Sequence, residues 1–201
     1  MSLPRLPIHS KGMRIGLFGG SFNPPHAGHR LVSEIALKRM KLDRVWWIVS
    51  PGNPLKNNAD LPPLDQRMEL CAHVAHHPKI AITGFEADIG TRYTYDTIAY
   101  LKARCPDVHF VWLMGADNLA GFHRWQQWQR IAHLVPIAVI DRPGSTLKAV
   151  SARAGHYLSE HRYAEDDASQ LAAATPPALL FLHGQRSFLS STAIRKGLVK
   201  P

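Results

Sequence analysis

Apolar residues gather in short runs flanked by Gly, Pro or Asp, and this pattern predicts buried β-strands. The runs are continuous in apolar residues rather than alternating, which is typical of strands covered on both faces of a sheet. The predicted strands are Met13 to Phe18, Arg44 to Val49, Ile80 to Thr83, His109 to Met114, Ile137 to Ile140 and Leu179 to Leu182.

Helical patterns separate these strands. In the clearest one, Leu31 and Ile35, and likewise Val32, Ala36 and Met40, recur at four-residue steps along one face, so this helix is expected to pack on the sheet. The alternation of strand and helix predicts an α/β fold, a Rossmann-like doubly wound parallel sheet in a single domain. The other predicted helices are Leu64 to Ala75, Thr94 to Arg104 and Trp125 to His133.

Two segments have no clear pattern: Pro51 to Pro63 is expected to form a mobile surface loop, and Pro143 to Pro177 is the least regular part of the chain. In doubly wound sheets, ligands bind beyond the carboxyl ends of the strands. The first residues to suspect of function are therefore those that follow Phe18, Val49, Met114 and Leu182.

Length and composition fit one cytoplasmic domain. With 201 residues and a hydrophobic fraction of 45%, the chain can bury its own core. No run reaches the roughly 20 apolar residues of a membrane span, and residues 1–12 lack the apolar stretch of a secretory signal. We expect these residues to form an N-terminal tail before a domain at 13–201. Cys71 and Cys105 are too few for a disulfide framework and are interpreted as reduced, structural thiols.

The charge balance favours anionic partners. There are 24 Lys and Arg against 15 Asp and Glu, a net charge of +9. Because the basic residues are scattered rather than gathered in a block, we expect small anionic ligands instead of nucleic acid or a membrane.

The segment from Gly19 to His29 carries the strongest chemical pattern. Glycines after a strand let the backbone approach a phosphate, and Pro24 and Pro25 suit a helix start whose free N–H groups attract anions. His26 and His29 share one face of the first turn, so both imidazoles can donate to phosphate oxygens. The segment reads Gly19-Gly20-Ser21-Phe22-Asn23-Pro24-Pro25-His26-Ala27-Gly28-His29.

Other catalytic motifs are missing from the sequence. It contains no Walker loop, no Gly-x-Gly-x-x-Gly dinucleotide fingerprint and no Gly-x-Ser-x-Gly elbow. A zinc site at His26 and His29 lacks a third ligand nearby. The plain alternative is a strand-to-helix turn whose histidines only cap the helix.

A group of His and Cys residues invites a metal interpretation, since positions 73, 76 and 77 share a helical face. Its position at a predicted helix end before Pro78 gives a plainer account, because histidines are favoured near a helix C-terminus. The group consists of Cys71, His73, His76 and His77.

A second motif, Ser190-Ser191-Thr192-Ala193-Ile194-Arg195, follows the strand Leu179 to Leu182 and precedes a short predicted helix. Ser190 or Ser191 can cap that helix, and the hydroxyls, free N–H groups and Arg195 would converge on an anion.

Together, the two motifs resemble those of the nucleotidyltransferase superfamily, which has a glycine-rich His-x-Gly-His signature followed by Ser-Ser-Thr-x-x-Arg. The long form with Ser21, Asn23, Pro24 and Pro25 is most similar to the bacterial nicotinate-nucleotide adenylyltransferases. The resemblance extends from about Met13 to Leu198.

The resemblance also assigns roles to weaker sites. Lys56 matches the family's loop lysine, although the residue before it, often histidine in the family, is Leu55 here. Gly115 and Asp117 match a Gly-Ala-Asp that lines the nucleotide site; without the resemblance they read as a turn and a helix cap.

Two further sites concern the pyridine nucleotide. Thr94 lies in a match to Tyr-Thr-x-Asp-Thr, a region that holds the nicotinate carboxylate largely through backbone N–H groups, and would otherwise read as a helix cap. Trp125 matches the tryptophan that stacks on the pyridine ring, whereas Trp128 is assigned to packing.

The reaction implied by the resemblance transfers the adenylyl group of ATP to nicotinate mononucleotide, giving deamido-NAD and pyrophosphate in NAD biosynthesis. His26 and His29 would contact the ATP phosphates, and Lys56 and Arg195 the departing pyrophosphate. Mg²⁺ would be carried by the ATP phosphates, with no dedicated protein metal site. The remaining ATP-binding residues would be Gly19, Gly20, Ser21, Phe22, Asn23, Gly115, Asp117, Ser190, Ser191 and Thr192.

Three alternatives remain open. One is an adenylyltransferase acting on nicotinamide mononucleotide or phosphopantetheine. Another is a basic nucleic-acid-binding module, which would explain the charge and the tryptophans but neither motif. The third is a nucleotide-sensing domain without catalysis, which would release no pyrophosphate.

Overall fold

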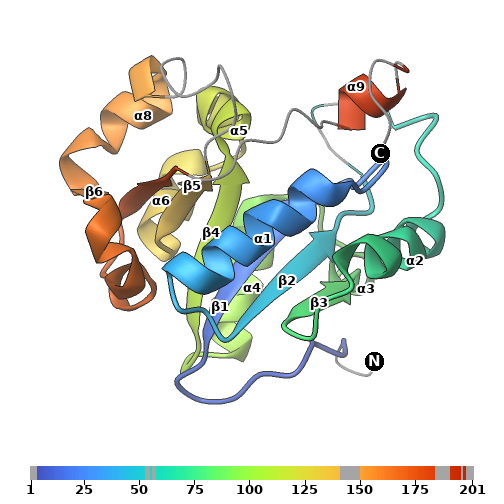
Figure 1. The fold of residues 1–201 in the computed structure, drawn as a ribbon, viewed down its shortest axis with the longest axis horizontal. Helices are drawn as coiled ribbons and strands as arrows, with labels where there is room; N and C mark the ends of the chain where they lie inside the picture. Colours follow the sequence, from blue (N-terminus) through green and yellow to red (C-terminus); the bar gives the residue numbers. More distant parts are fainter. Residues whose placement is uncertain are drawn as a thin grey trace.

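The computed structural model describes residues 4–52, 55, 58–140, 150–183, 191–195 and 197, and within them the chain forms one seven-stranded sheet. From edge to edge the strands run β3-β2-β1-β4-β5-β7-β6, and every neighbouring pair is parallel. The predicted doubly wound parallel sheet is therefore confirmed (Figure 1). The strands are β1 (Arg14–Gly20), β2 (Arg44–Val49), β3 (Ile80–Thr83), β4 (His109–Gly115), β5 (Ile137–Ile140), β6 (Arg162–Tyr163) and β7 (Leu179–Leu182).

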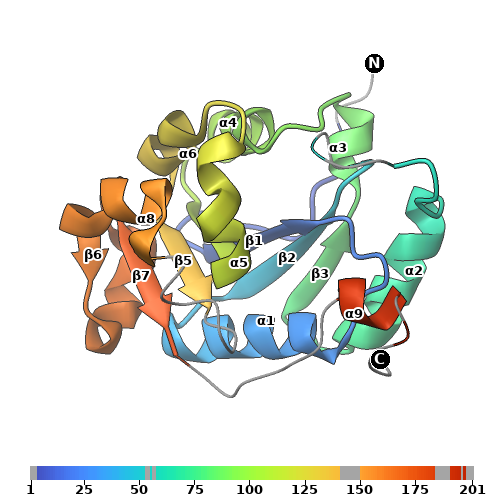
Figure 2. The same ribbon diagram turned by 90° about the horizontal axis from the view of Figure 1, so that it is seen from above.

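Helices cover both faces of this sheet. Figure 2 shows α1 and α2 on one face and α3, α4 and α6 on the other. The α-helices are α1 (Ala27–Arg39), α2 (Leu64–Ala75), α3 (Phe85–Asp88), α4 (Thr94–Arg104), α5 (Ala116–Gly121), α6 (Trp128–Leu134), α8 (Arg153–Tyr157) and α9 (Ser191–Arg195). Segments of 3-10 helix occur at η1 (Phe122–Arg124), η2 (Ser159–His161) and η3 (Glu165–Ala173).

Two apolar cores lie on opposite faces of the sheet. Trp46 and Trp47 are consecutive in β2, and both side chains are fully buried, Trp46 in one core and Trp47 in the other. This follows from the alternation of side chains along a strand. Helix α1 buries Val32, Ala36 and Met40, as its four-residue steps predict.

The predicted helix from Trp125 to His133 begins too early. Helix α6 starts at Trp128, because Trp125 has an extended backbone and Gln127 a left-handed one, with φ of 55°. The N–H of Trp125 is donated to the carbonyl of Phe122, which closes η1 instead of opening α6. Trp125 and Trp128 therefore do not share one helix.

The segment from Pro143 to Pro177 is more regular than expected where the structure describes it, from residue 150 onward. It contains α8, η2, β6 and η3. Strand β6 has two residues that pair with β7 at Leu179 and Leu180. A strand this short has too few positions to display a period, so it was missed.

Residues of the N-terminal segment contact the folded domain. Leu6 packs against the core, and the N–H of Gly12 is donated to the carbonyl of Asp107.

Cys71 and Cys105 are buried free thiols, and burial raises the pKa of Cys71 to about 12. Among the described residues, no helix is long and apolar enough to span a membrane.

The direction of strand addition reverses between β1 and β4, which are neighbours at the centre of the sheet. The chain builds outward from β1 toward β3 on one side and from β4 toward β6 on the other. In open α/β sheets this switch point leaves a crevice at the carboxyl ends of the strands. Here those ends are Gly20 and Gly115.

Candidate active site

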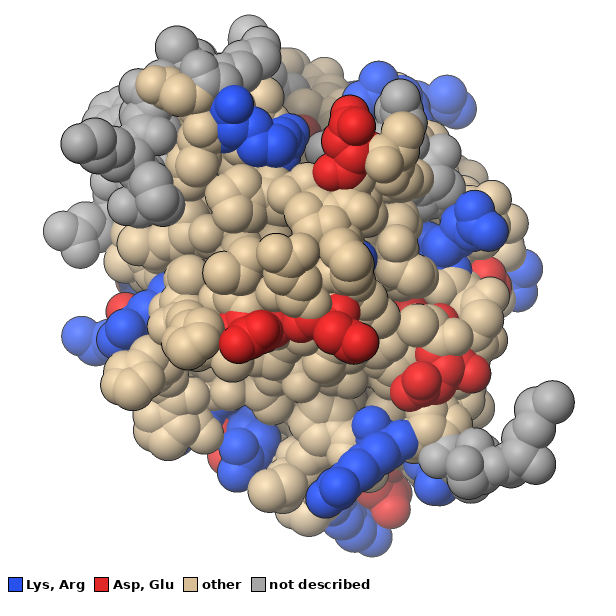
Figure 3. Space-filling view, turned by 90° about the vertical axis from the view of Figure 1, so that its right-hand side faces the viewer, with Lys and Arg blue, Asp and Glu red and all other residues tan. Residues whose placement is uncertain are grey.

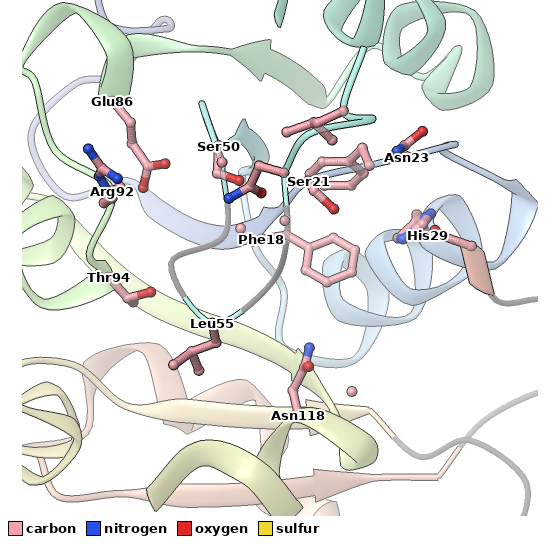
Figure 4. A pocket seen from close by; sticks show the side chains of 18 of the residues that line it. Phe18, Ser21, Asn23, His29, Ser50, Leu55, Glu86, Arg92, Thr94 and Asn118 are labelled. Carbon is pink, nitrogen blue, oxygen red and sulfur yellow. The ribbon is translucent and has the colours of Figure 1, made fainter. Parts of the chain in front are cut away.

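A cavity of about 460 Å³ lies at the carboxyl ends of β1 and β4 (Figure 4). Every predicted site residue that the structure describes lines it. These residues are Gly19, Gly20, Ser21, Phe22, Asn23, His26, His29, Thr94, Gly115, Asp117, Trp125, Ser191, Thr192 and Arg195. Lys56 and Ser190 lie outside the described residues.

The two histidines are held together at the start of α1. His26 is the N-cap residue in an extended conformation, and its ring centroid lies 3.8 Å from that of His29. The backbone N–H of His26 is donated to Nδ1 of His29 at 3.1 Å. A ring nitrogen that accepts an N–H carries no proton, so the neutral His29 ring has its proton on Nε2. The Nε2–H side of the His29 ring lies in the wall of the cavity.

An aromatic wall fixes the His29 ring from behind. The rings of Phe18, Phe22 and Trp47 have centroids 5.8, 5.0 and 5.9 Å from it. Phe22 is only 3% exposed and stacks on Trp47 at an interplanar angle of 12°. Phe22, which was predicted to bind ATP, lines the cavity, and its ring also packs against His29 and Trp47.

Glycine is required at position 19 because β1 and β4 approach closely there. A Cβ built on Gly19 would lie 2.6 Å from the indole of Trp112, a distance that real contacts do not reach. Any larger residue would displace this buried tryptophan from the wall of the cavity.

The C-terminal motif contacts the N-terminal one directly. Ser191 Oγ donates to the carbonyl of Pro24 at 2.8 Å, and Arg195 Nη1 donates to the carbonyl of Asn23. Ser191 is the first residue of α9, and its hydroxyl proton is donated to the facing loop. The two motifs, remote in sequence, form adjoining walls of one cavity.

Thr94 and Trp125 lie on the side of the cavity formed by α4 and η1. Thr94 is the first residue of α4, where backbone N–H groups have no partner within the helix. Trp125 is held edge-on by Trp112 and Phe122, with centroids 6.2 and 5.3 Å away. Trp128 instead contacts Phe122 and Tyr157 and does not line the cavity.

Comparison with known proteins places the chain in a family. The model of the cytidylyltransferase-like family matches residues 17–197. This chain belongs to the cytidylyltransferase-like family. A relative from Methylorubrum extorquens, named a probable nicotinate-nucleotide adenylyltransferase, is 58% identical over 91% of this chain and 99% of its own. One of the same name from Brucella abortus is 56% identical over 94% of this chain and 97% of its own. The predicted resemblance is confirmed.

Solved structures of the family share the fold. Nicotinic acid mononucleotide adenylyltransferase from Plasmodium falciparum, complexed with NaAD, superposes with a TM-score of 0.67 at 17% identity. The match covers 92% of this chain and 84% of that one. A putative nicotinate-nucleotide adenylyltransferase from Vibrio parahaemolyticus has a TM-score of 0.53 at 18% identity, over 73% and 92% of the two chains.

Sequence reasoning missed Arg67, which braces this family member's cavity from inside α2. Its side chain is 1% exposed. Nη1 donates to the carbonyls of Ser21 and Ser50, and Nε to that of Pro62, each at 2.8 Å. Burial lowers the pKa of Arg67. A signal existed in the sequence, because Arg67 lies four residues before Cys71 on the buried stripe of α2.

Sequence reasoning also missed Glu86 and Arg92, which line the cavity near Thr94. Glu86 is 5% exposed, and burial raises its pKa to about 7 although a hydrogen bond from Thr97 opposes the shift. Glu86 follows the carboxyl end of β3 by three residues. Ligands bind beyond the carboxyl ends of the strands in such sheets, so including the end of β3 among the suspected positions would have indicated Glu86.

The histidine group at the end of α2 has a structural explanation in this family member. His76 is the C-cap residue of α2, and Nδ1 of His77 accepts the N–H of Lys79 at 3.1 Å. In the described part of the chain, no group of three His, Cys, Asp or Glu side chains could hold a metal ion.

The positive charge of the chain is dispersed on the face that lies to the right in Figure 1. Figure 3 shows Lys and Arg side chains apart from one another there, with acidic side chains across the middle. Among the described residues, those visible on this face form no continuous basic surface of the kind that tracks a nucleic-acid backbone.

Proposed function

We propose that the protein transfers the adenylyl group of ATP to nicotinate mononucleotide, producing deamido-NAD and pyrophosphate in NAD biosynthesis. The observation that carries this proposal is the junction of the two motifs at Pro24 and Ser191, beside the paired imidazoles of His26 and His29. The relatives' names, at 56–58% identity over nearly the whole chain, support the same reaction.

The chemistry is an in-line displacement at the α-phosphorus of ATP. A phosphate oxygen of the mononucleotide forms the new O–P bond, and the bond to the bridging oxygen of pyrophosphate breaks, so pyrophosphate leaves with the electron pair. No covalent enzyme intermediate is needed. Catalysis then consists of positioning both substrates and stabilising charge on the transferring phosphate.

The N-terminal motif would bind the phosphate chain of ATP, and the arginine of the C-terminal motif would bind the departing pyrophosphate. His26 and His29 would contact the phosphate chain, with Nε2–H of His29 as one donor, as its Nδ1 hydrogen bond requires. Arg195, and Lys56 from the loop after β2, would bind the departing pyrophosphate as fixed and flexible cations.

The acceptor would lie on the opposite side of the cavity. The free N–H groups at the start of α4, an 11-residue helix, favour a carboxylate next to Thr94. The half-buried indole of Trp125 offers a flat face to the pyridine ring. Nicotinamide mononucleotide and phosphopantetheine remain the alternative acceptors.

We propose that Mg²⁺ enters with ATP, bound to its phosphates and to water. An ion held in this way needs few protein ligands, and Asp117 is the motif carboxylate on the cavity wall that is available to it. The ion would neutralise phosphate charge. A cytoplasmic location stays a prediction from the sequence.

The test is to incubate the protein with ATP and Mg²⁺ plus each candidate acceptor and to identify the adenylylated product. Deamido-NAD and pyrophosphate in equal amounts are the expected result. Binding of both nucleotides without pyrophosphate release would favour the nucleotide-sensing alternative. Strongly salt-dependent binding to polynucleotides, without product, would favour the nucleic-acid module.

A further inference from the structure

A buried carboxyl group, that of Glu86, faces the cavity on the side assigned to the acceptor. Glu86 lies in α3, is 5% exposed and lines the cavity. Figure 4 shows it beside Arg92, with Thr94 below and His29 on the far side. A buried ionisable group in a substrate cavity is a candidate for function.

Hydrogen bonds tie Glu86 to the first turn of α4. Thr97 Oγ1 donates to Oε1 of Glu86 at 2.6 Å, and the N–H of Thr91 is donated to the Glu86 carbonyl at 3.0 Å. Thr97 lies three residues after Thr94, on the same side of the helix. The second carboxyl oxygen, Oε2, forms no hydrogen bond with any described residue and remains available to a ligand.

We propose that Glu86 contacts the substituent at position 3 of the acceptor's pyridine ring and discriminates there between a carboxylate and a carboxamide. This inference rests on the proposed function, because it needs the pyridine ring to lie between Thr94 and Trp125. It adds a side chain that reads the chemical difference between the two acceptors.

The two protonation states of Glu86 select opposite acceptors. The protonated group donates its Oε2–H to a carboxylate, while Oε1 still accepts from Thr97. The ionised group repels a carboxylate and accepts an N–H from a carboxamide. Because burial raises the pKa of Glu86 to about 7, both states are populated near neutral pH.

Other charged groups also lie near Glu86. Asp60 and Arg92 share the cavity wall with it, while α2 turns neutral Leu64 and Met68 toward Gly84 at the start of α3. The charged residues on the surrounding elements are Arg44 at the far end of β2, Asp65, Arg67 and Glu69 in α2, Asp88 in α3, and Asp96, Lys102 and Arg104 in α4. His29 lies on the far side of the cavity, with the ring of His26 beside it.

The experiment compares kcat/KM for nicotinate and nicotinamide mononucleotides in the wild-type protein from about pH 6 to about pH 8. Both acceptors carry the same ribose phosphate, so pH effects on that phosphate and on the groups that bind it cancel in the ratio. Where nicotinamide mononucleotide turns over too slowly, its inhibition constant against the other acceptor supplies the comparison.

The nicotinate preference is expected to fall about 100-fold over this range, because the ratio of protonated to ionised Glu86 drops from about ten to about one tenth between one pH unit below and one pH unit above the pKa. In Glu86→Gln the amide donates at every pH, so the preference should stay at the wild-type value for low pH. Asp88→Asn, an exposed change on the same helix, should behave like the wild type.

A preference that does not change with pH in the wild type would overturn the inference. An equal decline in Glu86→Gln would also do so, since another group would then be responsible. In both cases dinucleotide is still produced, so the proposed function stands. Failure of both acceptors to yield a dinucleotide would instead contradict the proposed function itself.

Discussion

The hydroxyl of Ser191 donates to the carbonyl of Pro24 at 2.8 Å, a contact between residues 167 positions apart. It joins the short helix α9 to the loop that leads from β1 into α1. Arg195, one turn later in α9, makes a second link through the carbonyl of Asn23. The two motifs therefore form adjoining walls of one cavity.

Replacing Arg195 with Met should raise the KM for ATP about 10- to 100-fold, since a hydrogen bond to a charged group contributes about 1.5–3 kcal/mol. The free energy of unfolding should change little, because the side chain is exposed. Steady-state kinetics and urea unfolding measure the two effects. Arg153→Met, an exposed change on α8, is the matched control, and an equal loss in both variants would remove the assigned role.

Replacing His29 with Ala should lower kcat by about 10²–10³, the effect typical of removing one donor from a developing negative charge. The unfolding midpoint should shift much less than turnover. His156→Ala, at an exposed position on α8, should keep wild-type kinetics. Wild-type turnover in a folded His29→Ala protein would exclude His29 from catalysis.

Replacing Trp125 with Ala should raise the KM for the pyridine nucleotide more than the KM for ATP, because the indole lines the acceptor side of the cavity. Trp128→Ala removes packing against Phe122 and Tyr157 and should mainly lower stability. Initial rates with each substrate varied in turn separate these effects. Equal increases in both KM values would return Trp125 to a purely structural role.

The stability of the fold should depend on pH through Glu86. Its pKa rises from 4.5 to about 7 on burial, so between these values the folded chain holds a proton that the unfolded chain has released. The free energy of unfolding therefore falls as pH rises through this window, by about 3 kcal/mol at most. Below it the contribution is constant.

Chemical denaturation of the wild type and of Glu86→Gln from about pH 4 to about pH 8 tests this sign. The variant should gain stability relative to the wild type as pH rises, because its amide does not titrate. Asp88→Asn provides the control on the same helix. A constant difference across the range would show that folding does not raise the pKa of Glu86.

The fold followed from the sequence wherever a pattern was long enough to show a period. Strands β2, β3, β5 and β7 and helices α2 and α4 begin and end where the apolar pattern predicts. The two-residue strand β6 was missed, and the start of α6 was misplaced because the left-handed backbone at Gln127 leaves no trace in hydrophobic spacing. Glutamine is not one of the residue types that usually adopt a left-handed backbone, so Gln127 gave no signal there.

The sequence by itself determined the sheet, the two motifs and their order, because apolar periodicity and the residue types that bind phosphate are properties of local stretches. Only the tertiary structure decided that Ser191 meets Pro24, that Arg67 braces the loops at Ser21 and Ser50, and that Glu86 lines the same cavity as Thr94. Those relationships join segments far apart along the chain, and burial depends on the whole packed fold. The distances and raised pKa values on which function depends arise only there.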